Sequence, residues 1–318
     1  MLAIYFEGRP AIRELPLPQP DSGEVLIRVR LAGICRTDLE VLKGYHEFRG
    51  VMGHEFVGQV EGPQNSPWLG RRVVGEINIS CGGCDLCRGG LARHCRRRRV
   101  LGLKGRDGAF AQFLALPAGN LHLVPDNLPD EVAVFTEPLA AALRVMEVAP
   151  VVPGGLALVV GDGPLGLLSA WALAAAGLKV HLVGHHPGHL DLGRTPDIDT
   201  FLEQDFTGGD YGIVVEASGS PQGLKLALER VRPLGTVVLK STYAGHFPLD
   251  PATLVVPEVR LAGSRCGPFP QALSLLAGGG LDPRPLISRR YPLSQGLAAL
   301  EEAQGRGRLK ILLDCLAT

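Results

Sequence analysis

Apolar and polar residues alternate along residues 24–33 (EVLIRVRLAG), which is the pattern of a strand with one buried face. A second alternating stretch with glycines, VMGHEFVG, predicts a further strand end around His54. After residue 155 the pattern changes: a continuous apolar run at 156–161 (LALVVG) precedes an Ala-rich helical segment, LLSAWALAAAG. The pattern therefore predicts strands at these two places in the first part of the chain, and a strand followed by a helix in the middle.

The middle of the chain continues to alternate between the two kinds of element. Strands are predicted at 179–183 (KVHLV), at 211–217 (YGIVVEA) and in GTVVLKS, with a helix at 222–230. Such alternation predicts an α/β domain with a doubly wound parallel sheet. Its most apolar stretch, residues 156–184, is broken by glycines, Asp162, Pro164 and Lys179, and lacks the ~20 apolar residues of a membrane span.

Length and composition fit a globular protein of more than one domain. The 318 residues exceed one core of typical size, and the 46% hydrophobic and 20% charged residues argue against extensive disorder. Lys+Arg and Asp+Glu both number 32, a balance that argues against a nucleic-acid or membrane partner. The four arginines at 96–99 are expected to form a solvated or subunit-facing loop. The N-terminus shows no secretory signal, so a cytoplasmic location is expected.

Four of the seven cysteines crowd into one loop, as Cys81, Cys84, Cys87 and Cys95. In a cytosolic protein this spacing is typical of a metal site rather than of disulfides. Four thiolates complete the tetrahedral shell of a structural Zn²⁺ and leave no position for substrate. An iron–sulfur cluster or idle thiols are the alternatives, but a ferredoxin-like run is tighter and ends in proline, whereas Arg96 follows here. The site, at about residues 80–96, should hold a lobe together.

A second group of metal-binding residue types is spread more widely. Cys35 follows the first strand in GICRTD, and His54 and Glu55 lie together in VMGHEFVG. A thiolate, an imidazole and a carboxylate form a mixed shell of the catalytic kind, which leaves a place for substrate. Packing or a buried hydrogen bond explains each residue alone, so the prediction depends on all three.

The glycine-rich turn after the strand at 156–161 has the G-x-G-x-x-G order. Gly161 permits the tight turn, Gly163 lets the backbone approach a pyrophosphate, and Gly166 lets the helix pack on the strand. The helix N-terminus offers free N–H groups to the phosphates. A purely structural turn is the alternative. The residues predicted to contact the dinucleotide here are Gly161, Gly163, Pro164, Leu165, Gly166 and Ser218.

The second strand of this half lacks the carboxylate that usually binds the ribose 2′-hydroxyl of NAD. Gly184, His185 and His186 stand there instead, and the next acidic residue is Asp191. Histidines can be protonated beside a 2′-phosphate, so the sequence favours NADP(H) over NAD(H) and adds both histidines to the cofactor contacts. An exposed turn is the alternative.

Taken together, these residues resemble the zinc-containing medium-chain dehydrogenase/reductase family, which includes alcohol, polyol and threonine dehydrogenases. The resemblance runs in order through GICRTD, GHE, the four-cysteine loop, DGAFAQF, EPLA, GDGPLG and PLSQGLAALE. It implies a GroES-like β-rich catalytic domain, residues 1–133 plus 265–318, around an inserted Rossmann dinucleotide-binding domain, residues 134–264. The active site is expected in the cleft between them.

The resemblance also implies a role for four residues near the catalytic zinc. It puts Cys35, His54, Glu55 and Glu137 at the ion, and leaves open whether Glu55 or Glu137 binds it directly. For Glu137, a carboxylate that stabilises a helix N-terminus is the alternative.

Residues after Cys35 match further positions of the family. Asp38 matches the carboxylate that orients the zinc-bound histidine, and Thr37 the hydroxyl that bonds the substrate oxygen and passes its proton outward. Helix N-terminal positions are the alternative for both. Arg36 matches a cation near the pyrophosphate. Glu40 replaces the histidine that ends the proton relay in many members, so the relay is expected to run through Glu40 or water.

Other segments depart from the family pattern. The segment 185–210 is several residues shorter than usual, so a helix and a strand are expected to be trimmed. Lys240 and the three residues after it replace a small apolar loop, and are either part of the pocket or of the surface. Tyr45, His46 and Phe48 are expected either to line the pocket or to pack as an ordinary loop.

The function implied is hydride transfer between a small polar alcohol, polyol, sugar or amino alcohol and NAD(P), with one catalytic and one structural Zn²⁺. One alternative is NADPH-dependent reduction of aldehydes or ketones. Another, from a different class, is a non-catalytic nucleotide-binding protein that keeps the fold. The resemblance alone implies a homo-oligomer, either a dimer or a tetramer.

Overall fold

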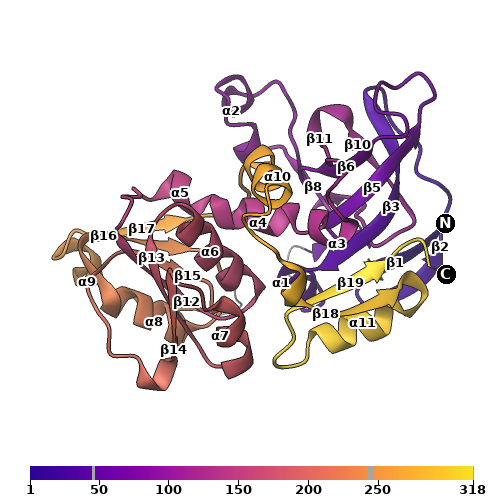
Figure 1. Cartoon of the computed structure of the whole chain (residues 1–318). Coiled ribbons are helices and arrows are strands. Elements are labelled where there is room, and N and C mark those ends of the chain that lie inside the picture. Colours follow the sequence, from indigo (N-terminus) through magenta and orange to yellow (C-terminus); the bar gives the residue numbers. More distant parts are fainter. Residues whose placement is uncertain (45–46, 242–245, 318) are drawn as a thin grey trace. The chain divides into compact units, whose positions relative to one another are not determined.

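The computed structural model describes residues 1–44, 47–241 and 246–317. The chain divides into two compact units (Figure 1): the first is Met1–Glu137 with Leu273–Thr318, and the second is Pro138–Ala272. It leaves the first unit within α4 (Thr136–Leu143) and returns within α10 (Phe269–Ala277). The boundaries expected from the resemblance, after residues 133 and 264, both precede these points.

A seven-stranded sheet forms the framework of the first unit. Its strand order is β11-β6-β5-β3-β19-β18, and β10 also pairs with β3. The central strand β3 extends over Glu24–Ile34 and pairs antiparallel with β5 (Glu55–Gly62) and β19 (Lys310–Asp314). Two segments far apart in sequence therefore flank the strand that leads to Cys35. The other strands are β6 (Arg72–Gly75), β10 (Phe113–Pro117), β11 (Leu121–Leu123) and β18 (Ile287–Pro292).

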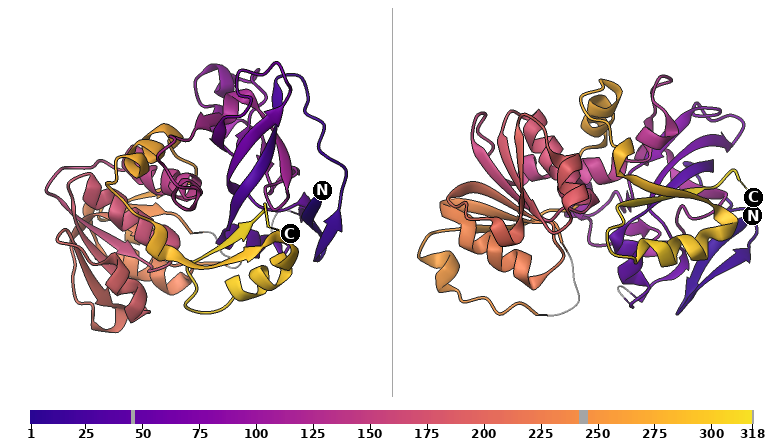
Figure 2. Two further views of the ribbon diagram at one scale, coloured as in Figure 1. Left: turned by 45° about the vertical axis from the view of Figure 1, so that its right-hand side comes forward. Right: turned by 60° about the horizontal axis from the view of Figure 1, so that its bottom comes forward.

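Smaller elements complete the first unit. One three-stranded sheet contains β1 (Leu2–Glu7), β2 (Pro10–Glu14) and β4 (Arg49–Val51), and another contains β7 (Asn78–Ile79), β8 (Arg99–Leu101) and β9 (Gly105–Arg106). Its short helices are α1 (Arg36–Val41), α2 (Asp85–Arg88) and α3 (Asp130–Ala133). Helix α11 (Gly296–Ala303) packs along β18 and β19, as both views in Figure 2 show.

The second unit is an open sheet of six parallel strands in the order β14-β13-β12-β15-β16-β17. The strands are β12 (Leu156–Val160), β13 (Lys179–Gly184), β14 (Ile198–Leu202), β15 (Tyr211–Glu216), β16 (Val231–Leu239) and β17 (Arg260–Gly263). The order reverses between β12 and β15, and dinucleotides bind at such switch points in open α/β sheets. The prediction of a doubly wound parallel sheet is confirmed.

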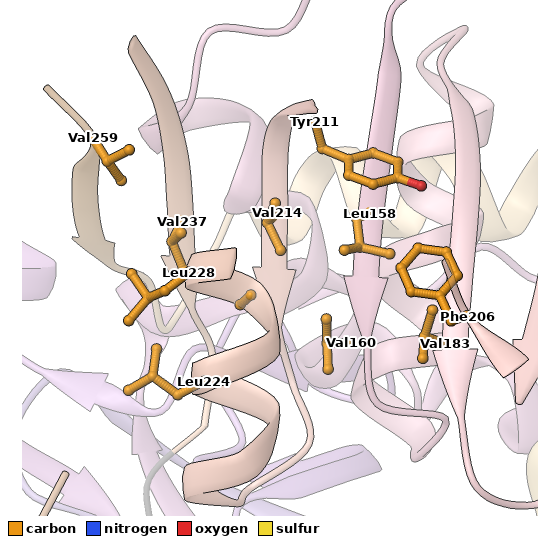
Figure 3. Packing of buried hydrophobic residues seen from close by; sticks show 11 residues of the cluster. Leu158, Val160, Val183, Phe206, Tyr211, Val214, Leu224, Leu228, Val237 and Val259 are labelled. Atoms are coloured by element: carbon orange, nitrogen blue, oxygen red, sulfur yellow. The ribbon is translucent and has the colours of Figure 1, made fainter. Parts of the chain in front are cut away.

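Helices cover both faces of this sheet. Right-handed connections place α6 (Pro164–Ala175) and α7 (Pro187–Gly193) on one face and α8 (Pro221–Arg230) on the other. Figure 3 shows Leu224 and Leu228 of α8 beside the sheet residues Val214 and Val237 in one buried cluster. Two further helices, α5 (Val145–Val148) and α9 (Ala252–Val255), have four residues each.

The segment 185–210 contains a helix and a strand, both short: α7 has seven residues and β14 has five. Within the segment, only the helical turn Glu203–Asp205 follows β14 before β15 begins. Across the described parts of both units, every helix falls short of the length and apolar character that a bilayer crossing requires.

Candidate metal and dinucleotide sites

Cys35, His54 and Glu55 come together at one end of the central sheet. Cys35 follows β3 directly, and His54 and Glu55 lie at the start of β5, which pairs with β3. One ligand atom from each lies within 4.8 Å of the other two. Gly33 faces Glu55 in the register and has to lack a side chain, because a Cβ there would overlap the Glu55 carboxylate. The strand pairing itself therefore builds this group.

Asp38 holds two members of the group in place. Its Oδ1 lies 3.2 Å from His54 Nδ1, and its Oδ2 accepts a 2.8 Å hydrogen bond from the backbone N–H of Cys35. Burial lowers the pKa of His54, but the Asp38 carboxylate and Cys35 outweigh this and raise the pKa well above its usual value. The Nδ1 bond to Asp38 leaves Nε2 as the nitrogen for a metal.

Glu55 is bonded through one of its two carboxylate oxygens. Oε2 accepts a 2.6 Å bond from Lys310 Nζ, which also donates to the Ile34 carbonyl at 3.3 Å. Burial lowers the pKa of Lys310, but the charge of Glu55 outweighs it, so the pKa is raised. Oε1 is buried without a hydrogen-bond partner among the described residues. A zinc ion bound by sulfur, nitrogen and this oxygen would satisfy it, so the donor set fits zinc.

Lys310 was missed by the sequence reasoning. It starts β19, where it is 3% exposed, and three apolar residues follow it before Asp314. A buried lysine needs a partner of opposite charge, so a lone lysine at the start of an apolar run was the available signal.

Other predicted residues of the first unit lie on or near α1 and α4. Thr37 Oγ1 lies 3.8 Å from Cys35 Sγ. One oxygen of the Glu40 carboxylate, Oε1, forms ion pairs with Arg36 at 3.3 Å and with Lys43 at 2.9 Å. Glu137 lies in the first turn of α4 and is 9% exposed, and it is outside the group of three that could share one ion.

The remaining loop residues divide into described and undescribed ones. Tyr45 and His46, like residues 242–245, lie outside the described residues, and Phe48 is buried. The side chain of Lys240 forms hydrogen bonds within the second unit: its Nζ donates to the Ala141 carbonyl at 2.6 Å and to Ser264 Oγ at 3.2 Å.

The four cysteines of the loop between β7 and β8 form a compact sulfur cluster. Their Sγ–Sγ distances are 3.4 Å for Cys84–Cys87, 3.5 Å for Cys81–Cys95, 3.8 Å for Cys84–Cys95 and 3.9 Å for Cys81–Cys87. Four sulfurs each about 2.3 Å from one zinc ion have such separations in a tetrahedron. Hydrogen bonds from the Gly83 backbone and Cys95 lower the pKa of Cys81 to about 6. The cluster is therefore suited to one tetrahedral ion.

The glycine turn connects β12 to α6 as the sequence suggested. Gly161 has φ +117, and a Cβ there would lie 2.7 Å from the Ala217 carbonyl. Gly163 caps α6, and Pro164 and Leu165 start it. Gly166 lies against the Gly161 carbonyl, where a Cβ would overlap it. Ser218 Oγ donates to Glu216 Oε1 at 2.6 Å. The backbone at this helix N-terminus is thus shaped for close approach by a phosphate.

Carboxylates contact the two histidines at the end of β13, although sequence reasoning found none there. Asp162 Oδ2 accepts bonds from the backbone N–H of His185 (3.0 Å) and His186 (2.6 Å), and lies 3.1 Å from His186 Nδ1. His185 Nε2 lies 3.1 Å from Glu203 Oε2. Asp162 reaches this position because Gly184 has no side chain, and a Cβ there would overlap it. Asp162 belongs to the glycine turn and precedes β13 in the sequence, so the residues that follow the strand do not reveal it.

Known proteins resemble one part of the chain or almost its whole length. Residues 21–126 match the family described as Alcohol dehydrogenase GroES-like domain. An L-threonine 3-dehydrogenase of Streptomyces avermitilis is 33% identical over 95% of this chain and 95% of its own length. A D-altritol 5-dehydrogenase of Agrobacterium fabrum is 31% identical over 93% of this chain and 94% of its own. The predicted GroES-like part is therefore confirmed.

Solved structures resemble the whole chain. A putative zinc-binding dehydrogenase of Sinorhizobium meliloti 1021 bound to NADP has a TM-score of 0.90 and 26% identity, with 98% of each chain covered. A short chain alcohol dehydrogenase of Escherichia coli CFT073 complexed with NADH has the same TM-score and identity, with 99% of each chain covered. These two relatives thus hold different forms of the nicotinamide cofactor.

Proposed function

The chain belongs to the zinc-containing medium-chain dehydrogenase/reductase family, and from this premise we propose that it oxidises a small polar alcohol, polyol, sugar or amino alcohol with NAD(P)⁺. The products are the carbonyl compound, NAD(P)H and a proton. The observation that carries the proposal is the group of Cys35, His54 and Glu55, with Asp38 bonded to His54.

We assign the catalytic zinc to Cys35, His54 and Glu55. A zinc ion at this place supplies Lewis acidity that makes a substrate hydroxyl easier to deprotonate. The unpartnered Glu55 Oε1 supports direct binding by Glu55 rather than Glu137. Lys310 holds the other Glu55 oxygen, and Asp38 fixes the ring of His54.

The substrate's proton needs a path away from the site. Thr37 is our candidate for the group that accepts the hydrogen bond from the substrate hydroxyl, which its position 3.8 Å from Cys35 Sγ supports. Glu40 is the next acceptor along α1, where its carboxylate pairs with Arg36 and Lys43. A nicotinamide ring held by the residues of the glycine turn would supply the acceptor for the hydride of the alcohol carbon.

The four-cysteine loop is proposed to hold the second, structural zinc. Its sulfur separations of 3.4 to 3.9 Å support a closed tetrahedral shell of Cys81, Cys84, Cys87 and Cys95. A closed shell leaves no position for a substrate, so this zinc serves the loop's conformation.

The dinucleotide is proposed to bind at the turn Gly161–Gly166, with Ser218 nearby and Arg36 toward the pyrophosphate. We propose NADP(H) as the preferred form, because Gly184 offers no carboxylate to a 2′-hydroxyl and the side chains of His185 and His186 are 66% and 43% exposed. Asp162 supports the opposite preference, since its negative charge lies beside His186.

A fluorescence titration with NADPH and NADH tests this preference. We expect tighter binding of NADPH by the wild type. Asp162→Asn keeps an oxygen acceptor for the two backbone N–H groups but removes the charge. If the wild type instead prefers NADH and this variant gains NADPH affinity, Asp162 sets the preference and the NADP(H) proposal is wrong.

The reaction is tested by assaying small polyols, sugars and amino alcohols with NAD⁺ and NADP⁺ on the zinc-loaded protein. We expect turnover that His54→Ala abolishes. The matched control is His122→Ala, which should leave turnover intact. His122 lies in β11, and its Nε2 is 3.2 Å from Glu76 Oε1. Equal turnover in both variants contradicts the zinc assignment. Dinucleotide binding without any turnover of alcohols or of the corresponding carbonyl compounds favours the non-catalytic alternative.

A homo-oligomer is proposed through the edge of the second unit. Strand β17 is the last strand at one edge of the parallel sheet. Apolar side chains are exposed on this strand and shortly before it in the chain: Leu261 on β17 is 37% exposed, and Val255 and Val256 are 72% and 81% exposed. A second copy of the chain would cover them and extend the sheet. Light scattering after size exclusion should give a dimer or tetramer, and a monomer at micromolar concentration contradicts the proposal.

A further inference from the structure

A third group of metal-binding side chains lies in the second unit, apart from both proposed zinc sites. It consists of Asp162 from the glycine turn, His186, which directly precedes α7, and His189 in the first turn of α7. One ligand atom from each lies within 4.8 Å of the other two.

The distances among these atoms suit a single ion. His186 Nδ1 lies 3.3 and 3.1 Å from the two Asp162 oxygens, and His189 Nδ1 lies 4.0 Å from Oδ2. Ligand atoms about 2.1 Å from one ion are roughly 3–3.5 Å apart in tetrahedral geometry. The two imidazole rings lie 4.6 Å apart between centroids, and His189 Nδ1 also donates to the main-chain carbonyl of Asp162 at 3.1 Å, a hydrogen bond that an ion bound at Nδ1 would replace.

The carboxylate is fixed before any ion arrives. Backbone N–H groups of His185 and His186 bond Asp162 Oδ2, so its orientation does not depend on a metal. The side chains of Asp162 and His189 are 8% and 12% exposed, whereas that of His186 is 43% exposed. An ion can therefore enter from the side of His186 and complete its shell with solvent.

We propose that Asp162, His186 and His189 bind one divalent transition-metal ion. Two imidazoles and one carboxylate are ligands that such ions accept readily. Binding changes the local charge from that of one carboxylate to a net positive value, at the end of β13 where the 2′ position of a dinucleotide lies in this fold. The ion thereby favours NADPH over NADH, a consequence that rests on the proposed function.

Cobalt(II) is the probe, added to protein whose resident zinc has been confirmed by elemental analysis. We expect one Co²⁺ bound per chain beyond the zinc, with a visible spectrum that lacks the sulfur-to-cobalt charge-transfer band of a cysteine site. His189→Ala and His186→Ala should each lose this equivalent. His185→Ala is the matched control and should keep it, because its ring contacts Glu203.

Three results overturn the proposal. They are an absent extra equivalent, a cobalt spectrum with the sulfur band, and unchanged binding in both histidine variants. For the cofactor, saturating Co²⁺ should raise the ratio of NADPH to NADH affinity at least about tenfold in the wild type but not in His189→Ala. An unchanged ratio removes that consequence. If neither dinucleotide binds with or without cobalt, the proposed function fails while the metal result still stands.

Discussion

Asp38 shows how one buried carboxylate organises the proposed catalytic zinc site. It bonds the His54 ring and the backbone of Cys35 at once, so its loss affects two ligands. The residue is 0% exposed, so solvent does not compete for either contact.

We expect Asp38→Asn to weaken retention of the catalytic zinc by about 10–100-fold, because an amide lacks the negative charge that supports a metal-bound imidazole. Competition with a chromophoric chelator measures this. Asp21→Asn, at an exposed position before β3, is the control. Equal zinc affinity in the two variants would show that Asp38 has only a structural role.

At the residue scale, chemistry that is local in sequence was predictable and chemistry that depends on long-range pairing was not. Cys35, Asp38, His54 and Glu55 lie in two short motifs, and they do come together. Lys310 reaches Glu55 only because β19 pairs with β3, which no local pattern reveals.

Among the elements, α8 depends on a local cap. Ser220 Oγ accepts a 3.0 Å bond from the Gly223 N–H, which satisfies one of the free donors at the start of the helix. Leu224 and Leu228 then pack against the sheet from the same helix face.

Ser220→Ala should reduce the free energy of unfolding by about 1 kcal/mol, since the cap is lost while the packing stays. Urea denaturation of the two proteins gives the difference. Ser220→Asn restores a capping oxygen and should recover most of the loss; if it does not, the cap is not the cause.

Periodicity and turn residues predicted where strands and helices lie in the sequence, but they did not predict which elements contact one another. The expected strand at 24–33 is β3, Glu24–Ile34, and the helix expected at 222–230 is α8, Pro221–Arg230. What periodicity could not reveal is the approach of Asp162 to His186, because it depends on the parallel pairing of β12 with β13 and on the space left by Gly184.

At the scale of the whole molecule, the four-cysteine loop is the part where the proposed structural zinc has the clearest consequence. Its α-helix, α2, has four residues and its 3-10 helix, Ala92–His94, has three, and none of them is buried, so apolar packing contributes little to holding its conformation.

We expect Cys95→Ala to lose one zinc per chain and to become sensitive to trypsin between residues 88 and 99, where arginines are frequent, while the rest of the chain resists cleavage. Cys266→Ala, outside the loop, is the control. A Cys95→Ala protein that keeps both zinc ions, or that resists trypsin as the wild type does, contradicts the structural role of this ion.

The first unit is assembled from both ends of the chain, since β19 pairs with β3 beside the strand that carries Glu55. During synthesis on the ribosome, the second unit is complete long before residue 310 emerges from the exit tunnel. The pairing of β19 with β3 and the Lys310–Glu55 ion pair can form only after residue 310 has been translated. Premature termination before codon 310 would therefore release a chain with an intact parallel sheet but without β19 and the Lys310 partner of Glu55.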